Sequence, residues 1–126
     1  MREAVIVSTA RTPIGKAYRG AFNDIESPSM AAPIIKEAIK RAKLDPGEID
    51  DVIMGAALQQ GTQGFNVARQ CAVAAELPVS IAGQSVDRQC SSGLMSIDDR
   101  RRSSSTGCRP WSQAASNLSA WSRTST

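Results

Sequence analysis

The chain has 126 residues, of which 41% are hydrophobic and only 4% aromatic, so we expect one modest core built from small and aliphatic side chains. No apolar run approaches the roughly 20 residues needed to cross a bilayer, and the first residues lack the apolar stretch and cleavage site of a secretory signal. These features argue against a membrane partner and predict a soluble, cytoplasmic protein.

The net charge of +3 is unevenly distributed along the chain. Up to Ile97, ten Lys and Arg residues are balanced by ten Asp and Glu residues, so the whole basic excess lies after that position. The run Arg100–Arg102 has no interleaved aromatic residues, which a surface that binds single-stranded nucleic acid would need. We therefore interpret it as a solvated charge run and expect no nucleic-acid partner.

Three cysteines are present, Cys71, Cys90 and Cys108, and there is no histidine. An odd number of cysteines without metal-binding spacing does not form a disulfide framework. The missing histidine excludes a His-ligated zinc site and a Cys–His catalytic pair supplied by these residues alone. We expect no bound metal or cofactor.

Two elements are predicted in the first third of the chain. Ala4–Val7 is a short β-branched run that predicts a buried strand, and a loop rich in Gly, Pro and charge follows it. Ser29–Leu44 repeats apolar residues at three- and four-residue spacing, which predicts an amphipathic helix. Ser27 or Ser29 can cap its start, and Pro33 is expected to be tolerated only in the first turn.

The next elements alternate between strands and helices. Glu48–Asp50 is consistent with one helical turn, and Asp51–Met54 is predicted to be a strand. A helix of small residues follows at Asn66–Leu77, and Ala82–Val86 is predicted to be the next strand. This order predicts an α/β fold in which helices cover a mixed sheet.

Cys90 has three features of an activated thiol. It follows a predicted strand, it precedes a helix of small residues, and Arg88 lies just upstream. A helix N-terminus favours the thiolate, and the small residues Ser91–Gly93 would let backbone amides approach a thioester carbonyl. The alternative is that Cys90 is an inert small hydrophobe, as most isolated cysteines are. Cys71, in a predicted core helix, and Cys108 are weaker candidates.

Three segments of the chain carry a resemblance to a known family. AVIVSTARTPIGK, GAALQQGTQGFNVARQ and SVDRQCSSGLMSI resemble the N-terminal part of the thiolases, in the family's order, from about Arg2 to Ile97. The resemblance implies residues 1–97 of a partial thiolase-type fold, the first part of an N-terminal mixed-sheet α/β domain. In the family, the cysteine of the segment matching RQCSSG takes the acyl group from acyl-CoA, and here that residue is Cys90.

The implied chemistry is a Claisen condensation of acetyl-CoA, or the thiolytic cleavage of a 3-ketoacyl-CoA, through an S-acyl-cysteine. The resemblance also implies coenzyme A thioesters as substrates, a place in lipid metabolism such as fatty-acid β-oxidation, and a homo-oligomer. The ketoacyl synthases are the nearest alternative family. They share the fold and a nucleophilic cysteine but do not open with STARTPIGK.

Residues 98–126 depart from the family pattern. They contain eleven Ser and Thr residues and no helical or alternating periodicity, so we expect a non-homologous, disordered segment. Written as codons and read one base earlier, Pro110–Asn117 can encode Met-Val-Ala-Gly-Gly-Val-Glu, close to the strand expected here in a thiolase. This match predicts a change of reading frame shortly after Ile97.

The family's remaining catalytic groups are expected beyond this point. They are a histidine in a Gly-His-Pro segment, a second cysteine in a Cys-x-Gly segment, and an asparagine that positions a water. The sequence therefore predicts a truncated and inactive chain. The alternative function is an inactive fragment that acts at most as an interaction module.

Overall fold

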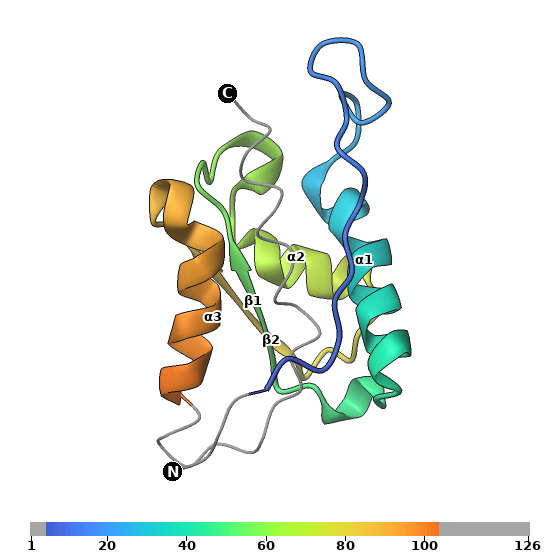
Figure 1. Ribbon diagram of the computed structural model, residues 1–126, viewed down its shortest axis with the longest axis vertical. Coiled ribbons are helices and arrows are strands. Elements are labelled where there is room, and N and C mark those ends of the chain that lie inside the picture. Colours follow the sequence, from blue (N-terminus) through green and yellow to red (C-terminus); the bar gives the residue numbers. More distant parts are fainter. Residues whose placement is uncertain (1–4, 104–126) are drawn as a thin grey trace.

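The computed structural model describes residues 5–103. Its regular elements follow one another as α1 (Ser27–Ala42), β1 (Asp51–Gly55), α2 (Val67–Ala74), β2 (Ala82–Val86) and α3 (Ser92–Ser103). Short 3-10 turns lie at Pro46–Glu48, Gly61–Gln63 and Gln89–Ser91. In Figure 1, α3 lies on one side of the two strands, and α2 followed by α1 lies on the other.

The strands β1 and β2 form a parallel pair in which Asp51 lies opposite Ala82 and Gly55 lies opposite Val86. A parallel pair needs a crossover connection, and α2 lies within it. The central residues of β1, from Val52 to Met54, are all buried, as expected for a strand covered on both faces. The predicted α/β class is confirmed, and the strands that the structure describes are paired in parallel.

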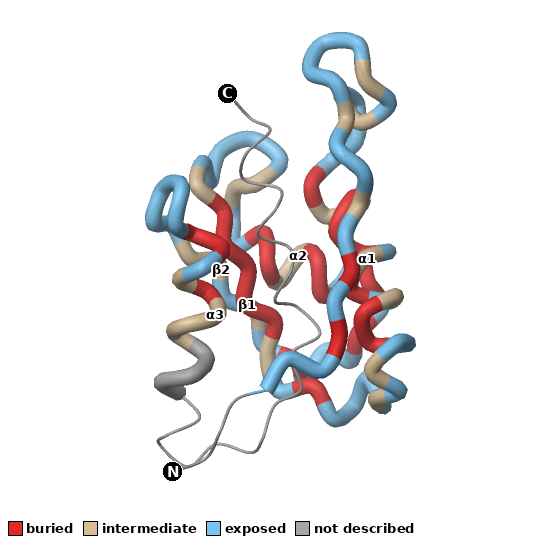
Figure 2. Tube along the Cα trace, in the orientation of Figure 1, coloured by how far each residue is buried: buried red, intermediate tan, exposed pale blue. Residues whose placement is uncertain are grey.

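The core lies between α1, α2 and β1 (Figure 2). The apolar faces of the two helices meet there, so the amphipathic pattern predicted for α1 is confirmed at Ile35, Ala38 and Ile39. The main members of the cluster are Ala31, Ile35, Ala38, Ile39, Val52, Met54, Val67, Ala68, Cys71 and Ala72.

Polar side chains fasten α2 to β2. Asn66, the N-cap of α2, donates from Nδ2 to the carbonyl oxygen of Gly83 at 2.7 Å, and its Oδ1 lies 3.2 Å from the Ser85 hydroxyl. The Arg69 guanidinium donates to the carbonyl oxygen of Ile81. These three contacts hold the first turn of α2 against β2 and the residue before it.

The start of α1 differs from the prediction. The helix begins at Ser27, after the N-cap residue Glu26, and neither serine caps it through a side-chain hydrogen bond. Pro28 lies in the first turn, where its fixed φ suits helix initiation and moves the start two residues upstream. Pro33 is consequently inside the helix rather than in its first turn, and its exposed position lets water replace the lost hydrogen bond.

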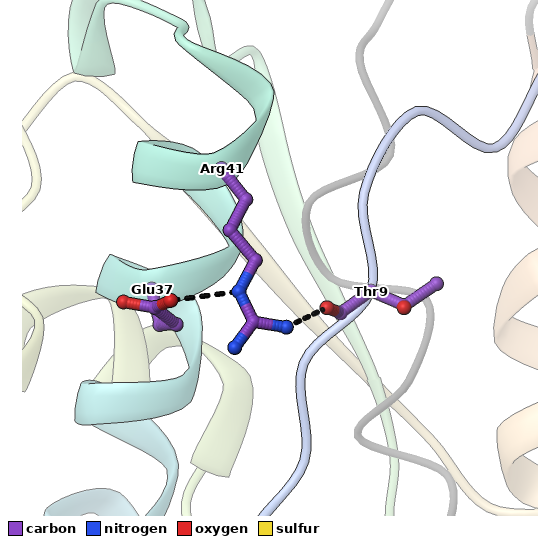
Figure 3. A network of polar contacts seen from close by, with 3 residues as sticks. All are labelled: Thr9, Glu37 and Arg41. Carbon is purple, nitrogen blue, oxygen red and sulfur yellow. Dashed lines mark hydrogen bonds and ion pairs between the residues drawn. The ribbon is translucent and has the colours of Figure 1, made fainter.

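The strand predicted at Ala4–Val7 is wrong for the residues that the structure describes. Val5, Ile6 and Val7 have no strand assignment and are 61%, 61% and 49% exposed. The segment runs beside α1 instead, where Arg41 donates to the carbonyl oxygen of Thr9 at 2.8 Å (Figure 3). β-branched residues form a strand only when a neighbouring strand pairs with them, and no strand among residues 5–103 pairs with this segment.

Arg41 also holds Glu37 of the same helix, with 2.7 Å between Nε and Oε1 (Figure 3). The hydrogen bond from Arg41 lowers the pKa of Glu37 below its ordinary value. One exposed arginine thus connects α1 to the N-terminal segment.

Most of the remaining boundaries lie within three residues of the sequence predictions, and the helix predicted at Asn66–Leu77 is observed as α2 at Val67–Ala74. The structure confirms β2 at Ala82–Val86 and extends β1 by one residue to Gly55. The helical turn expected at Glu48–Asp50 is a 3-10 turn at Pro46–Glu48, because Asp45 accepts from the Gly47 amide and starts it earlier. Helix α3 continues to Ser103, past the boundary predicted at Ile97.

Candidate active site

A short turn connects β2 to α3 and carries Cys90. Residues Asp87 and Arg88 follow β2 and lead into the 3-10 turn Gln89–Ser91, and α3 begins at Ser92. Cys90 is exposed and is a free thiol. The structure therefore places the predicted nucleophile at the surface, directly before the N-terminus of a helix.

Two side chains hold this turn together. The Ser92 hydroxyl accepts from the Arg88 amide at 2.9 Å and donates to the Gln89 carbonyl oxygen at 2.6 Å. The Asp87 carboxylate accepts from the Gln89 amide at 2.9 Å. Gln89 has a φ of 50°, a left-handed conformation that costs free energy for any residue with a side chain. The hydrogen bonds at both of its ends stabilise that conformation.

A glycine at the end of β1 lets α3 begin where it does. A Cβ on Gly55 would lie 2.3 Å from the carbonyl carbon of Ser92 and 2.4 Å from the Gly93 nitrogen. Both contacts are to backbone atoms, so no side-chain rotation could relieve them. The first turn of α3 packs directly on the strand, and Ser92 is fully buried as a result.

The Arg88 side chain contacts the helix that follows Cys90. Its guanidinium donates from Nη1 to the Met95 sulfur at 3.5 Å, one helical turn into α3. The side chain is therefore directed along the helix. The N-terminus of α3, which carries a partial positive charge, lies directly after the turn that holds Cys90.

The other described cysteine has the opposite environment. Cys71 lies inside α2, is 0% exposed, and places its sulfur 4.0 Å from the Met54 sulfur. Burial raises the pKa of its thiol from 9.0 to about 12. Such a thiol is protonated at neutral pH and is a core residue, while Cys108 lies outside the described residues.

The arrangement around Cys90 suits covalent catalysis. An exposed thiol can reach a carbonyl carbon, and the first amides of a helix have no partners inside the helix, so they can stabilise an oxyanion. Within residues 5–103 no group of His, Cys, Asp or Glu side chains could hold a metal ion. The same part of the chain contains no helix that is long and apolar enough to cross a membrane.

Two residues of this site were not singled out by the sequence. Ser92 was noted only as one of the small residues Ser91–Gly93, and Gly55 was not noted. A glycine directly after an apolar strand is a weak signal of close backbone approach, and the signal does not name the segment that approaches. The pairing of Gly55 with the start of α3 depends on the tertiary fold.

An α/β fold with an exposed cysteine between a strand and a helix N-terminus is compatible with covalent cysteine catalysis. The family model for the thiolase N-terminal domain matches residues 4–108, most of the chain. The chain belongs to the thiolase family.

Relatives of known name agree with this assignment. The chain is 46% identical over 97 residues to a 3-ketoacyl-CoA thiolase of Bacillus subtilis, an alignment that covers 77% of this chain and 25% of that protein. It is 37% identical over 97 residues to the peroxisomal 3-ketoacyl-CoA thiolase 2 of Arabidopsis thaliana, covering 77% and 21%.

Solved structures show the same fold. The acetyl-CoA acetyltransferase of Bacillus anthracis matches with a TM-score of 0.70 at 38% identity, over 76% of this chain and 24% of that one. The Acat5 thiolase of Ascaris suum, solved in complex with coenzyme A, matches with a TM-score of 0.75 at 33% identity, over 82% and 27%. The chain spans about a quarter of the length of the relatives it matches.

Proposed function

We propose that Cys90 is the residue that accepts the acyl group in a thiolase reaction. The observation that carries this proposal is the exposed Cys90 thiol at the start of α3, in a chain of the thiolase family. The proposed substrates are coenzyme A thioesters, and the complex of the Ascaris suum thiolase with coenzyme A supports them.

In the proposed first step the Cys90 thiolate attacks the carbonyl carbon of an acyl-CoA. A carbon–sulfur bond forms, the carbonyl oxygen takes the negative charge, and amides at the start of α3 stabilise it. The intermediate then collapses, the bond to coenzyme A breaks, and the CoA thiolate leaves. One thioester replaces another, so this step is nearly balanced in free energy.

The second step joins the acyl group to the enolate of acetyl-CoA, or in reverse cleaves a 3-ketoacyl-CoA. It needs a base to remove the α-proton, a role that the resemblance gives to the family's second cysteine, and the histidine that would activate Cys90 is not among the 126 residues. The histidine, the second cysteine and further oxyanion donors therefore have to come from outside this stretch. Thiolase activity is proposed for the complete site and not for these residues alone.

Two measurements test the proposal. The purified 126-residue chain should show no thiolysis of acetoacetyl-CoA. A chimera, in which residues 1–97 replace the matching quarter of the Bacillus subtilis relative, should cleave it. The substitution Cys90→Ala in the chimera should lower the rate at least about a thousandfold, as expected when a nucleophile is lost.

The matched control is Cys71→Ala in the same chimera, which should keep its activity because Cys71 is buried away from the turn. A folded chimera without activity, whose Cys90 is not acylated by acetyl-CoA, would contradict the proposal. Cleavage of acetoacetyl-CoA by the 126-residue chain, dependent on Cys90, would contradict the requirement for groups outside it.

The second candidate function is an interaction module without catalysis. The observation that favours it is the exposure of large apolar side chains: Val79 is 87% exposed, Leu94 72% and Ile6 61%. Each of these side chains is available for contact with a partner.

A homo-oligomeric assembly and a cytoplasmic location are also part of the proposal. The free thiols of Cys71 and Cys90 are those expected of a protein in a reducing compartment.

The reading-frame change after Ile97 also remains a proposal. Pro110–Asn117 and the rest of residues 104–126 lie outside the described residues. Sequencing the encoding DNA decides the question. A shifted frame that continues into Gly-His-Pro and Cys-x-Gly segments would support the change, and a shifted frame closed by stop codons would contradict it.

A further inference from the structure

We infer that Ser92 is a positioning residue for Cys90, which it holds directly before the start of α3. The inference rests on the proposed function, because it concerns the conformation in which Cys90 would react. Asp87 assists from the opposite side of the same turn.

The Ser92 side chain is 0% exposed although serine is polar, and its hydroxyl makes two short hydrogen bonds to the backbone. These bonds join the Arg88 amide and the Gln89 carbonyl to the first residue of α3. Cys90 lies inside the loop that they close. A buried hydroxyl that both donates and accepts across a turn constrains it more than an exposed one can.

Gln89 shows that the turn needs this constraint. Its φ of 50° is unfavourable for a residue with a side chain, so the free chain would relax away from it. Asp87 accepts from the amide of Gln89, and Ser92 donates to its carbonyl oxygen. When either bond is removed, the turn can relax and Cys90 can move away from the helix N-terminus.

The backbone behind Ser92 cannot move to compensate. The contact with Gly55 leaves no space between the strand and the first turn of α3. The start of α3 therefore has a fixed position. The hydrogen bonds of the Ser92 hydroxyl tie the turn to that position. Relaxation in a variant without this hydroxyl must therefore occur in the turn itself, where Cys90 lies.

The test measures the rate at which iodoacetamide alkylates Cys90 in the full 126-residue chain at pH 7. Cleavage by trypsin after Arg69, Arg88 and Arg102 leaves the three cysteines in separate peptides, so mass spectrometry follows each one. The variant Ser92→Ala should be alkylated about two- to fivefold more slowly, the effect of a charge leaving a helix N-terminus. Above about pH 10 an ordinary thiol is ionised in any position, so the difference should disappear there.

Two serine controls separate positioning from stability. Ser91→Ala removes an exposed hydroxyl beside Cys90 and should leave the rate unchanged. Ser96→Ala removes another buried hydroxyl of α3, which donates to the Gly93 carbonyl oxygen at 2.8 Å. That variant should lose stability in a urea melt but keep the pH profile of Cys90 alkylation.

Asp87 provides an independent pair of variants on an exposed position, where folding is not at risk. Asp87→Asn and Asp87→Ala both remove the charge, but only the asparagine keeps an oxygen that can accept from the Gln89 amide. Asp87→Ala should be alkylated about two- to fivefold more slowly than Asp87→Asn at pH 7. If Ser92→Ala does not fold, the difference in Cys90 alkylation rate between the two Asp87 variants tests the inference on its own.

Equal rates at pH 7 for Ser92→Ala and Ser91→Ala, or for the two Asp87 variants, would overturn the inference. A rate difference that stays constant up to pH 10 would also overturn the inference. Such a difference would reflect how easily iodoacetamide reaches the thiol and not where the thiol lies relative to the helix N-terminus. No acyl-CoA is used in this experiment. An inactive chimera together with the expected alkylation pattern would refute the proposed function and leave the role of Ser92 intact.

Discussion

Cys71 and Cys90 lie on either side of β2 in the sequence, and both belong to helical surroundings, yet their environments differ completely. Cys71 is in the middle of α2, with its sulfur against Met54 and no exposed surface. Cys90 lies before the first turn of α3 and is exposed.

The physical cause is the position of each thiol relative to its helix. The interior of a helix offers no free amides, and the face of α2 that carries Cys71 is packed in the core. The start of a helix presents unpartnered amides and a partial positive charge. The same side chain is thus a core hydrophobe in one place and a candidate nucleophile in the other.

The largest expected effect is the difference in native reactivity. Iodoacetamide should alkylate Cys90 at least about a thousand times faster than Cys71, because Cys71 reacts only after an opening that costs a large share of the free energy of unfolding. Peptide mass spectrometry over time measures both rates in one sample. In 8 M urea (roughly full unfolding for a small domain) the two rates should converge, and similar rates in native buffer would break the comparison.

The next largest effect is a loss of stability at the two strand glycines that contact the backbones of α3 and α2. Gly55 contacts the backbone of Ser92, and a Cβ on Gly83 would lie 2.6 Å from the Arg69 Cα. Each change to alanine forces backbone apart and should lower the free energy of unfolding by about 1–3 kcal/mol in a urea melt.

The local consequences should differ between these variants. Gly55→Ala displaces the start of α3 and should change the alkylation rate of Cys90, while Gly83→Ala displaces α2 and should weaken the protection of Cys71. Gly47→Ala, where the added carbon meets only the Asp45 side chain, is the control. Equal effects of Gly55→Ala and Gly83→Ala on both cysteines would show that the two regions do not respond separately.

The sequence was sufficient for the elements whose partners are close in the chain. The periodicity of α1 and the alternation of elements around β1 and β2 predicted their positions to within a few residues. The strand prediction failed for Val5–Val7. A β-branched composition indicates a preference for strand structure, but it does not show whether a neighbouring strand is available.

The site was only partly predictable for the same reason. The position of Cys90 in a turn between a strand and a helix could be predicted because these three segments are contiguous in the sequence. The support from Gly55 could not, because it comes from a strand far upstream. The conformation of Gln89 also has no local signal, since left-handed residues are usually Gly or Asn. The direction of the Arg88 side chain could not be predicted, because spacing along the chain does not fix how a long side chain lies, and here it reaches Met95 of α3.

The smallest expected effect is the response of stability to alkaline pH, and it comes from Cys71. Burial raises the pKa of this thiol from 9.0 to about 12 in the folded chain. The folded state therefore keeps the proton while the unfolded state loses it. The contribution is fully present below about pH 9 and is lost as pH rises towards 12. From linkage, the loss at pH 10 is roughly 1.4 kcal/mol relative to neutral pH.

Urea melts at pH 7 and pH 10 measure this loss, and a difference between variants isolates it from the other groups that titrate in this range. Cys71→Ala has no thiol to ionise, so its stability should fall less between the two pH values, by roughly 1.4 kcal/mol, than that of the unsubstituted chain. Cys90→Ala keeps the buried Cys71 thiol, so it should not show this smaller fall. If Cys71→Ala and Cys90→Ala lost the same stability, Cys71 would have to reach water in the native state, and the contrast between the two thiols would not hold.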